Sequence, residues 1–144
     1  MFVNGIIFLV SLLRGIRMYT CEHVPNRKAA QLSSSLKNTI NLYARGGFTV
    51  RTIMMDMEFK KVKDEKGMES IDVNTTTARE HVVEIERGIR YLKERSRCSV
   101  RTFAKAGIKY LAKPIVIQIV YNVTLFINVV PDPLGVSERY HRAK

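Results

Sequence analysis

The stretch that decides the fold consists of two segments, VRTIMMDMEF at residues 50–59 and AREHVVEIERGIRYLKERSR at residues 78–97. The first is an apolar run that ends in Asp56, and the second is a charged segment that carries Glu86 thirty positions later. The pattern predicts two carboxylates on different elements, one at the end of a strand and one early in a helix. A metal-dependent phosphoryl-transfer site can use carboxylates held in this way.

The strand reading of residues 48–55 gives Asp56 a positional argument as well. A helix intervenes before this run, so we expect the strand to lie parallel to its neighbour. Ligands of open α/β sheets bind outside the carboxyl ends of the strands, where Asp56 falls. The alternative is an aspartate that ends a strand and only faces water, and the spacing by itself favours this plainer interpretation.

The helix predicted from about residue 78 to 101 carries two patterns. Thr77 and Glu80 fit a capping box at its start. Its apolar stripe consists of Val82, Ile85, Ile89 and Leu92. A second row follows at steps of four, three and four, namely Glu86, Arg90, Lys93 and Arg97. A carboxylate at the head of a basic row suits a metal ion beside a phosphate backbone. The alternative is a solvated face with ion pairs such as Glu86 with Arg90.

The chain before this stretch predicts three antiparallel strands and a helix. Asn4-Gly5 favours a type I′ turn between strands at residues 1–3 and 6–13, because both central residues of that turn need positive φ. Arg14-Gly15 predicts a second turn, which leads into a strand at residues 16–24. Asn26 is the expected cap of a helix that runs to about residue 45 and ends at Gly46-Gly47.

The remaining segments complete the order β-β-β-α-β-(β)-α-α. Residues 70–74 predict a short edge strand. Residues 115–128 fit either a helix or a strand, since their apolar and β-branched side chains satisfy both patterns. Residues 131–144 form a polar, basic tail. We expect one domain over residues 1–130, which begins partway through its first strand.

Composition favours a polyanionic partner. The 144 residues include 24 Lys plus Arg and 13 Asp plus Glu, which gives a formal charge of +11. Such an excess indicates nucleic acid first and an anionic membrane surface second.

Cys21 and Cys98 have no CxxC spacing, so we expect free, buried thiols and no zinc site. The apolar opening is too short to span a bilayer and lacks a secretory pattern, which predicts a protein that is neither secreted nor transmembrane and leaves nucleus or cytoplasm open.

Taken together, these segments resemble the integrase catalytic core of copia-type retrotransposon polyproteins. VRTIMMDMEF resembles the family's strand that ends in Asp-Asn-Gly-Gly-Glu-Phe, and EIERGIRYLKERSR resembles its Glu-Arg segment with a basic helix. VYNVTLFINVVP resembles the later helix that ends in Asn-x-x-Pro. The resemblance covers nearly the whole chain and implies a ribonuclease-H-like α/β fold: a mixed sheet of three antiparallel and then parallel strands, with helices on both faces.

The resemblance also implies a function and a site. Asp56 would be the second and Glu86 the third acid of an Asp, Asp, Glu triad that binds Mg²⁺ or Mn²⁺. These metals would support phosphodiester cleavage and strand transfer in DNA integration. The expected partner is DNA, with neither a small-molecule substrate nor a membrane, and a homodimer is left open. The expected nucleic-acid-binding residues are Arg87, Arg90, Lys93, Arg97 and Arg101.

The departures from the family predict a fragment with weak or lost metal binding. No Asp or Glu precedes Glu22, and the first strand begins at Met1, just after the place of the family's first acid. The Gly-Gly after the second acid is replaced by Met57. Two carboxylates of a three-carboxylate cage hold a cation weakly, because charge count sets much of the affinity. Two alternatives are a non-catalytic nucleic-acid-binding module and a protein-interaction or membrane-surface domain.

Overall fold

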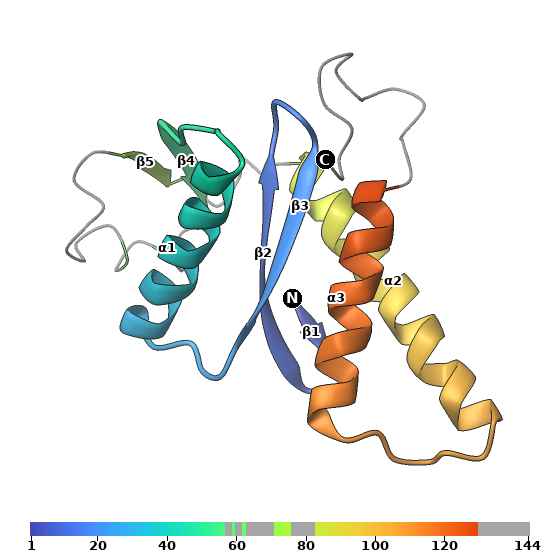
Figure 1. Ribbon diagram of the computed structural model, residues 1–144. Helices are drawn as coiled ribbons and strands as arrows, with labels where there is room; N and C mark the ends of the chain where they lie inside the picture. The colour runs from blue at the N-terminus through green and yellow to red at the C-terminus, as the bar shows by residue number, and fades with distance from the viewer. Residues whose placement is uncertain (57–58, 60–61, 63–70, 76–82, 130–144) are drawn as a thin grey trace. The chain divides into compact units, whose positions relative to one another are not determined.

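The computed structural model of the chain describes residues 1–56, 59, 62, 71–75 and 83–129 (Figure 1). The chain divides into two compact units, one formed by Met1–His23 with Glu84–Lys144 and the other by Val24–Val83. The predicted extent of a single domain over residues 1–130 stays a prediction.

The first unit opens with the predicted hairpin. Strands β1 (Phe2–Val3) and β2 (Ile6–Leu13) pair antiparallel, with Val3 opposite Ile6. Asn4 and Gly5 have φ values of 48° and 77°, which confirms the turn with positive φ at both central positions. Strand β3 (Met18–Val24) completes a sheet in the order β1-β2-β3. The second turn takes its positive φ at Arg17, at 51°, and not at Gly15.

Helices α2 (Val83–Lys105) and α3 (Lys113–Val129) belong to the same unit. The sequence left residues 115–128 open between helix and strand, and they are helical. Four of the buried residues on α3 recur at steps of four: Val116, Val120, Thr124 and Asn128. Ile119 is buried as well, and residues three and four apart share one face of a helix, so Val116, Ile119 and Val120 lie on one buried side of α3. In a strand Ile119 would face away from Val116 and Val120.

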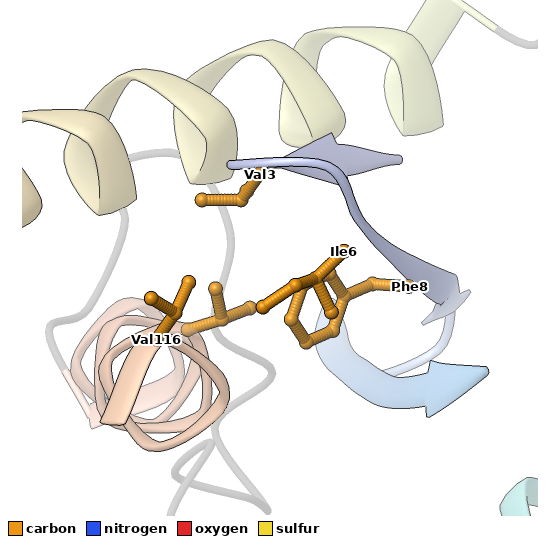
Figure 2. Close-up of a cluster of buried hydrophobic side chains, with 5 residues drawn as sticks. Val3, Ile6, Phe8 and Val116 are labelled. Atoms are coloured by element: carbon orange, nitrogen blue, oxygen red, sulfur yellow. The ribbon is translucent and has the colours of Figure 1, made fainter. Parts of the chain in front are cut away.

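The core of this unit lies between the hairpin and α3. Val3, Ile6 and Phe8 from the hairpin cluster with Val116 and Val120 from α3. Figure 2 shows the side chains of Val3, Ile6 and Val116 directed toward one another. Ile6 and Phe8 alternate along β2, so the period of a half-buried strand puts both on the core side. Among the described residues, no helix is both long and apolar enough to cross a membrane.

The second unit contains α1 (Ala29–Arg45) and two short strands. Leu32, Leu36 and Tyr43 form the buried apolar face of α1. The predicted cap is wrong by two residues. Lys28 occupies the cap position, and the Asn26 side chain instead accepts a hydrogen bond from the Lys28 backbone N–H at 3.0 Å. An Asx turn of this kind competes with helical capping, which moves the helix start to Ala29.

Strands β4 (Thr52–Met55) and β5 (Asp72–Thr75) pair in parallel, with Thr52 opposite Asp72 and Met55 opposite Thr75. The parallel direction is the one predicted, although β4 covers only the last half of the predicted run 48–55. The predicted start of the second long helix near residue 78 and the basic tail at 131–144 lie outside the described residues. The observed order is thus three antiparallel strands, one helix, a parallel pair and two helices.

Candidate functional site

Asp56 is the first residue after β4 and is exposed. Met55 before it is buried at 9% exposure, so the strand ends at a buried side chain and the next residue turns outward. The Phe59 backbone N–H donates to the Asp56 carbonyl at 2.9 Å. Asp56 therefore lies at the carboxyl end of a parallel strand pair, as the sequence predicts.

Glu86 lies in the first turn of α2 together with Glu84. Both acids are exposed, and Glu84 forms an ion pair with Arg14, at 3.0 Å between Nε and Oε2. Unsatisfied N–H groups give the first turn of a helix a partial positive charge, which stabilises carboxylates there. The position of Glu86 early in the helix is thus confirmed, and Glu84 is an acid of the same turn that sequence reasoning did not single out.

The buried side of α2 explains how the helix is oriented within its unit. Leu92 and Ser96 are fully buried, and Gly88 is buried beneath the ring of Tyr19 from β3. A Cβ atom at position 88 would lie 2.2 Å from Tyr19 Cε1, so only glycine admits the ring this close. The predicted stripe is confirmed at Leu92. Gly88 and Ser96 extend it as small residues that the apolar pattern missed, and their spacing of four from Leu92 is the signal that could have found them.

The opposite side of α2 carries most of the predicted nucleic-acid-binding residues. Four arginines of this set are exposed: Arg87, Arg90, Arg97 and Arg101. With 3.6 residues per turn, they and Glu86 fall within about 100° of arc around the helix axis. Lys93 differs, because it lies beside the buried side and is half-buried. A lysine stem that packs on apolar surface still reaches water with its ammonium group. We call the four arginines the α2 basic row.

Asp56 and Glu86 belong to different units of the chain. In the part of the chain that the structure describes, no group of three or more His, Cys, Asp or Glu residues could hold a metal ion.

Cys21 and Cys98 are free thiols. Cys21 is partly buried, and this burial raises its pKa to about 12, while Cys98 is exposed. The expectation of buried thiols is therefore met in part at Cys21 and is wrong for Cys98.

The order of elements gives the chain an α/β architecture, and its likeness to a solved structure shows the ribonuclease-H-like fold of integrase catalytic cores. The chain is similar to the crystal structure of the catalytic core domain of BIV integrase, with a TM-score of 0.63 and 17% sequence identity. The similarity covers 93% of this chain and 83% of that one. No protein-family model and no curated protein matches the sequence. The fold predicted from the order of elements is therefore confirmed.

Proposed function

We propose that this chain is a DNA-binding domain of the integrase-core type, related to retrotransposon integrases. Its ancestral chemistry is metal-dependent phosphodiester cleavage and strand transfer. As given, the chain binds DNA but supplies only part of the acid set for that chemistry. One observation carries the proposal: within an integrase-core fold, Glu86 in the first turn of α2 shares the exposed side of the helix with the α2 basic row.

The geometry of α2 suits a phosphate backbone. From Arg87 to Arg101 the helix rises about 21 Å at 1.5 Å per residue. Duplex DNA carries one negative charge per about 1.7 Å of its axis, so several phosphates come within reach of four arginines over that length. Arginine also binds phosphate through two N–H groups at once, which holds the backbone in register. Opposite the row, Leu92 and Ser96 anchor the helix in its unit.

The donor chemistry of Asp56 and Glu86 fits a hard divalent cation. Both present exposed carboxylates, and Mg²⁺ in phosphoryl-transfer sites takes one or two carboxylates together with water and substrate phosphates. Bound Mg²⁺ or Mn²⁺ supplies a Lewis acid that activates a hydroxyl nucleophile and stabilises the leaving oxygen. Asp56 and Glu86 are the residues that would hold it. With two acids in place of three, we expect weak metal binding.

A second candidate is DNA binding without any chemistry. It is favoured by the absence of Asp and Glu from residues 1–21, the segment that contains β1 and β2. The two candidates share the DNA contact on α2 and differ only in catalysis. The test of the shared step is therefore separate from the test of catalysis, which is given in the Discussion.

DNA binding is tested by the anisotropy of a labelled 30-base-pair duplex over a series of salt concentrations. Replacing Arg90, Arg97 and Arg101 by Gln is expected to reduce the slope of log K against log salt by about 2.7, at about 0.9 per phosphate contact. A matched control removes the same charge from three exposed cations of the other unit, Lys28, Arg45 and Arg51. The control should retain the slope. An unchanged slope in the α2 variant would remove this helix from the interface.

A further inference from the structure

The turn between α2 and α3 is held by a defined set of backbone hydrogen bonds. The Ile108 N–H donates to the Phe103 carbonyl at 3.0 Å, and the Gly107 N–H donates to the Ala104 carbonyl at 3.1 Å. Gly107 has a φ of 88°. This is the Schellman motif, in which a left-handed residue just past the helix satisfies its last carbonyls. The N–H groups of Ile115 and Val116 both bond to the Ala112 carbonyl, which starts α3. Both ends of the turn are therefore fixed.

This turn presents an aromatic side chain to solvent. Tyr110, near its centre, is 91% exposed. Figure 1 shows the turn joining the C-terminal end of α2 to the start of α3. Aromatic side chains bury more area than almost any other type, and tyrosine at an exposed tip is a common form of binding residue. Because the turn is already ordered, a ligand that stacks on Tyr110 would meet little further loss of backbone entropy.

The charges around Tyr110 are all of one sign. Residues 95–129 contain no Asp or Glu and six cations, namely Arg95, Arg97, Arg101, Lys105, Lys109 and Lys113. Lys105, Lys109 and Lys113 flank Tyr110 on both sides along the chain, and all three are exposed. Arg101 and Lys105 are four residues apart and so share one face of α2. The α2 basic row therefore runs on into the turn without an acidic interruption after Glu94.

We propose that the turn 105–113 is a second nucleic-acid contact, in which Tyr110 stacks on an unpaired base and the three flanking lysines contact the adjoining phosphates. The inference rests on the proposed function, because it needs DNA on the α2 basic row. It extends that function by assigning a preference for DNA with a single-stranded end beside the duplex. Stacking on an aromatic ring needs the free face of a base, which a paired and stacked duplex does not offer.

Charge complementarity favours nucleic acid over the other partners of an exposed aromatic. Cations on either side of a single ring match the repeat of phosphate and base along a strand. An anionic membrane attracts the same lysines, but tight binding at a membrane surface also needs a broad apolar face. Within residues 105–113, Ile108, at 47% exposure, is the other large hydrophobic side chain that is exposed; Phe103 and Ile115, at 37% and 45%, lie on the flanking helices. Lipid binding is therefore an outcome of the test and not the proposal.

The test compares two labelled DNA probes at one fixed salt concentration: a blunt 20-base-pair duplex and the same duplex with a five-thymidine 3′ overhang. Tyr110→Ala is expected to weaken binding of the overhang probe by about 5- to 150-fold, the range for loss of one base stack. Binding of the blunt duplex should change by less than about twofold, and Tyr110→Phe should keep the preference because it keeps the ring. At 91% exposure, Tyr110 can be replaced without loss of core packing.

Phe126→Ala provides the matched control, since Phe126 is 69% exposed on α3 and lies outside the turn. It should leave both probes unaffected. If the Tyr110→Ala variant binds each probe with the same affinity as the original chain, the inference is overturned while the proposed function stays in place. If Tyr110→Ala loses binding to vesicles that contain phosphatidylserine but binds both DNA probes as the original chain does, the inference is overturned in favour of a lipid contact. If neither duplex binds the original chain, the proposed function and this inference fall together.

Discussion

The side-chain amide of Asn128 on α3 pairs with the backbone of Tyr19 on β3 in both directions. Its Nδ2 donates to the Tyr19 carbonyl at 2.7 Å, and its Oδ1 accepts from the Tyr19 N–H at 2.9 Å. Four positions further along β3, the His23 N–H donates to the Tyr121 hydroxyl at 3.2 Å. In the three-stranded sheet β3 is an outer strand, and α3 supplies partners for its outward backbone groups. Covering a sheet edge in this way avoids unpaired polar groups and edge-to-edge association.

Asn128→Ala is expected to destabilise the fold. Asn128 is 5% exposed, and its removal leaves both the N–H and the carbonyl of Tyr19 without this partner. An unsatisfied buried group costs about 1–3 kcal/mol, so we expect a loss of unfolding free energy in that range or above, measured by urea denaturation. Asn122→Ala is the control: Asn122 is exposed and accepts a hydrogen bond from Gln118 on the same helix, so its loss should cost under about 0.5 kcal/mol. Equal effects of the two variants would contradict the edge-pairing role.

Gly88→Ala tests the close packing of Tyr19 on α2. Alanine in place of glycine inside a helix normally stabilises by about 0.5–1 kcal/mol. Here its Cβ would lie 2.2 Å from the Tyr19 ring, so the ring must shift and the sign should reverse to a loss of about 1–3 kcal/mol. The double variant with Tyr19→Ala provides the check, because without the ring Gly88→Ala should become neutral or stabilising. A stabilising effect of Gly88→Ala in the original chain would contradict the contact.

These two contacts mark the limit of what the sequence could predict. The Asn4-Gly5 turn and the place of Asp56 depend on local rules, turn conformation and strand period, and both were predictable. The roles of Gly88 and Asn128 depend on where α2 and α3 meet β3, and no local pattern reports that. Residues 115–128 stayed ambiguous for the same reason: their helical face becomes evident only once Val116 and Val120 have a hairpin to pack against.

The candidate site divides in a similar way. Glu86 in the first turn of α2 follows from helical period and charge, and so does exposure of the arginines. The half-burial of Lys93 could not be predicted from the spacing of the row. Lys93 fits that spacing, yet it lies beside the buried side of α2. Tyr110 gave no sequence signal, since a tyrosine beside a leucine is as typical of a partly buried position as of an exposed turn.

His23 gives the fold a pH dependence. Burial lowers the pKa of His23, and the charge of Lys113 lowers it further; its ring also meets Phe8 edge to face at 6.1 Å between centroids. A histidine whose pKa is lower in the folded state binds fewer protons there than in the unfolded chain. Stability is therefore highest above the unfolded pKa of about 6.5 and falls as the pH drops through that value toward the folded pKa.

We expect His23→Gln to lose less stability than the original chain between pH 7.5 and pH 5.5, measured by urea denaturation at both pH values. The other titrating groups are the same in both proteins, so their contributions cancel in the comparison. Lys113→Gln should fall between the two, because it removes the smaller of the two causes and leaves burial in place. The same pH dependence with and without His23 would show that its protonation is not coupled to folding.

Restoring a third acid tests the catalytic part of the proposed function. Residues 1–21 contain no Asp or Glu. Under the proposed function, Asp56 and Glu86 would be two of the three acids that the chemistry uses. A version of the chain extended at its N-terminus by a strand segment with an aspartate is expected to nick supercoiled plasmid in Mg²⁺ or Mn²⁺, because a third carboxylate raises the affinity for the cation. The original chain should cleave no more plasmid than a protein-free control.

Three control variants are made in the extended chain: asparagine in place of the added aspartate, Asp56→Asn and Glu86→Gln. Each should return cleavage to the level of the protein-free control. DNA binding should persist in all three, since the α2 basic row is unchanged. Equal cleavage by the original and extended chains would overturn the claim that an acid is missing. Cleavage that survives Asp56→Asn and Glu86→Gln would remove these two carboxylates from the site.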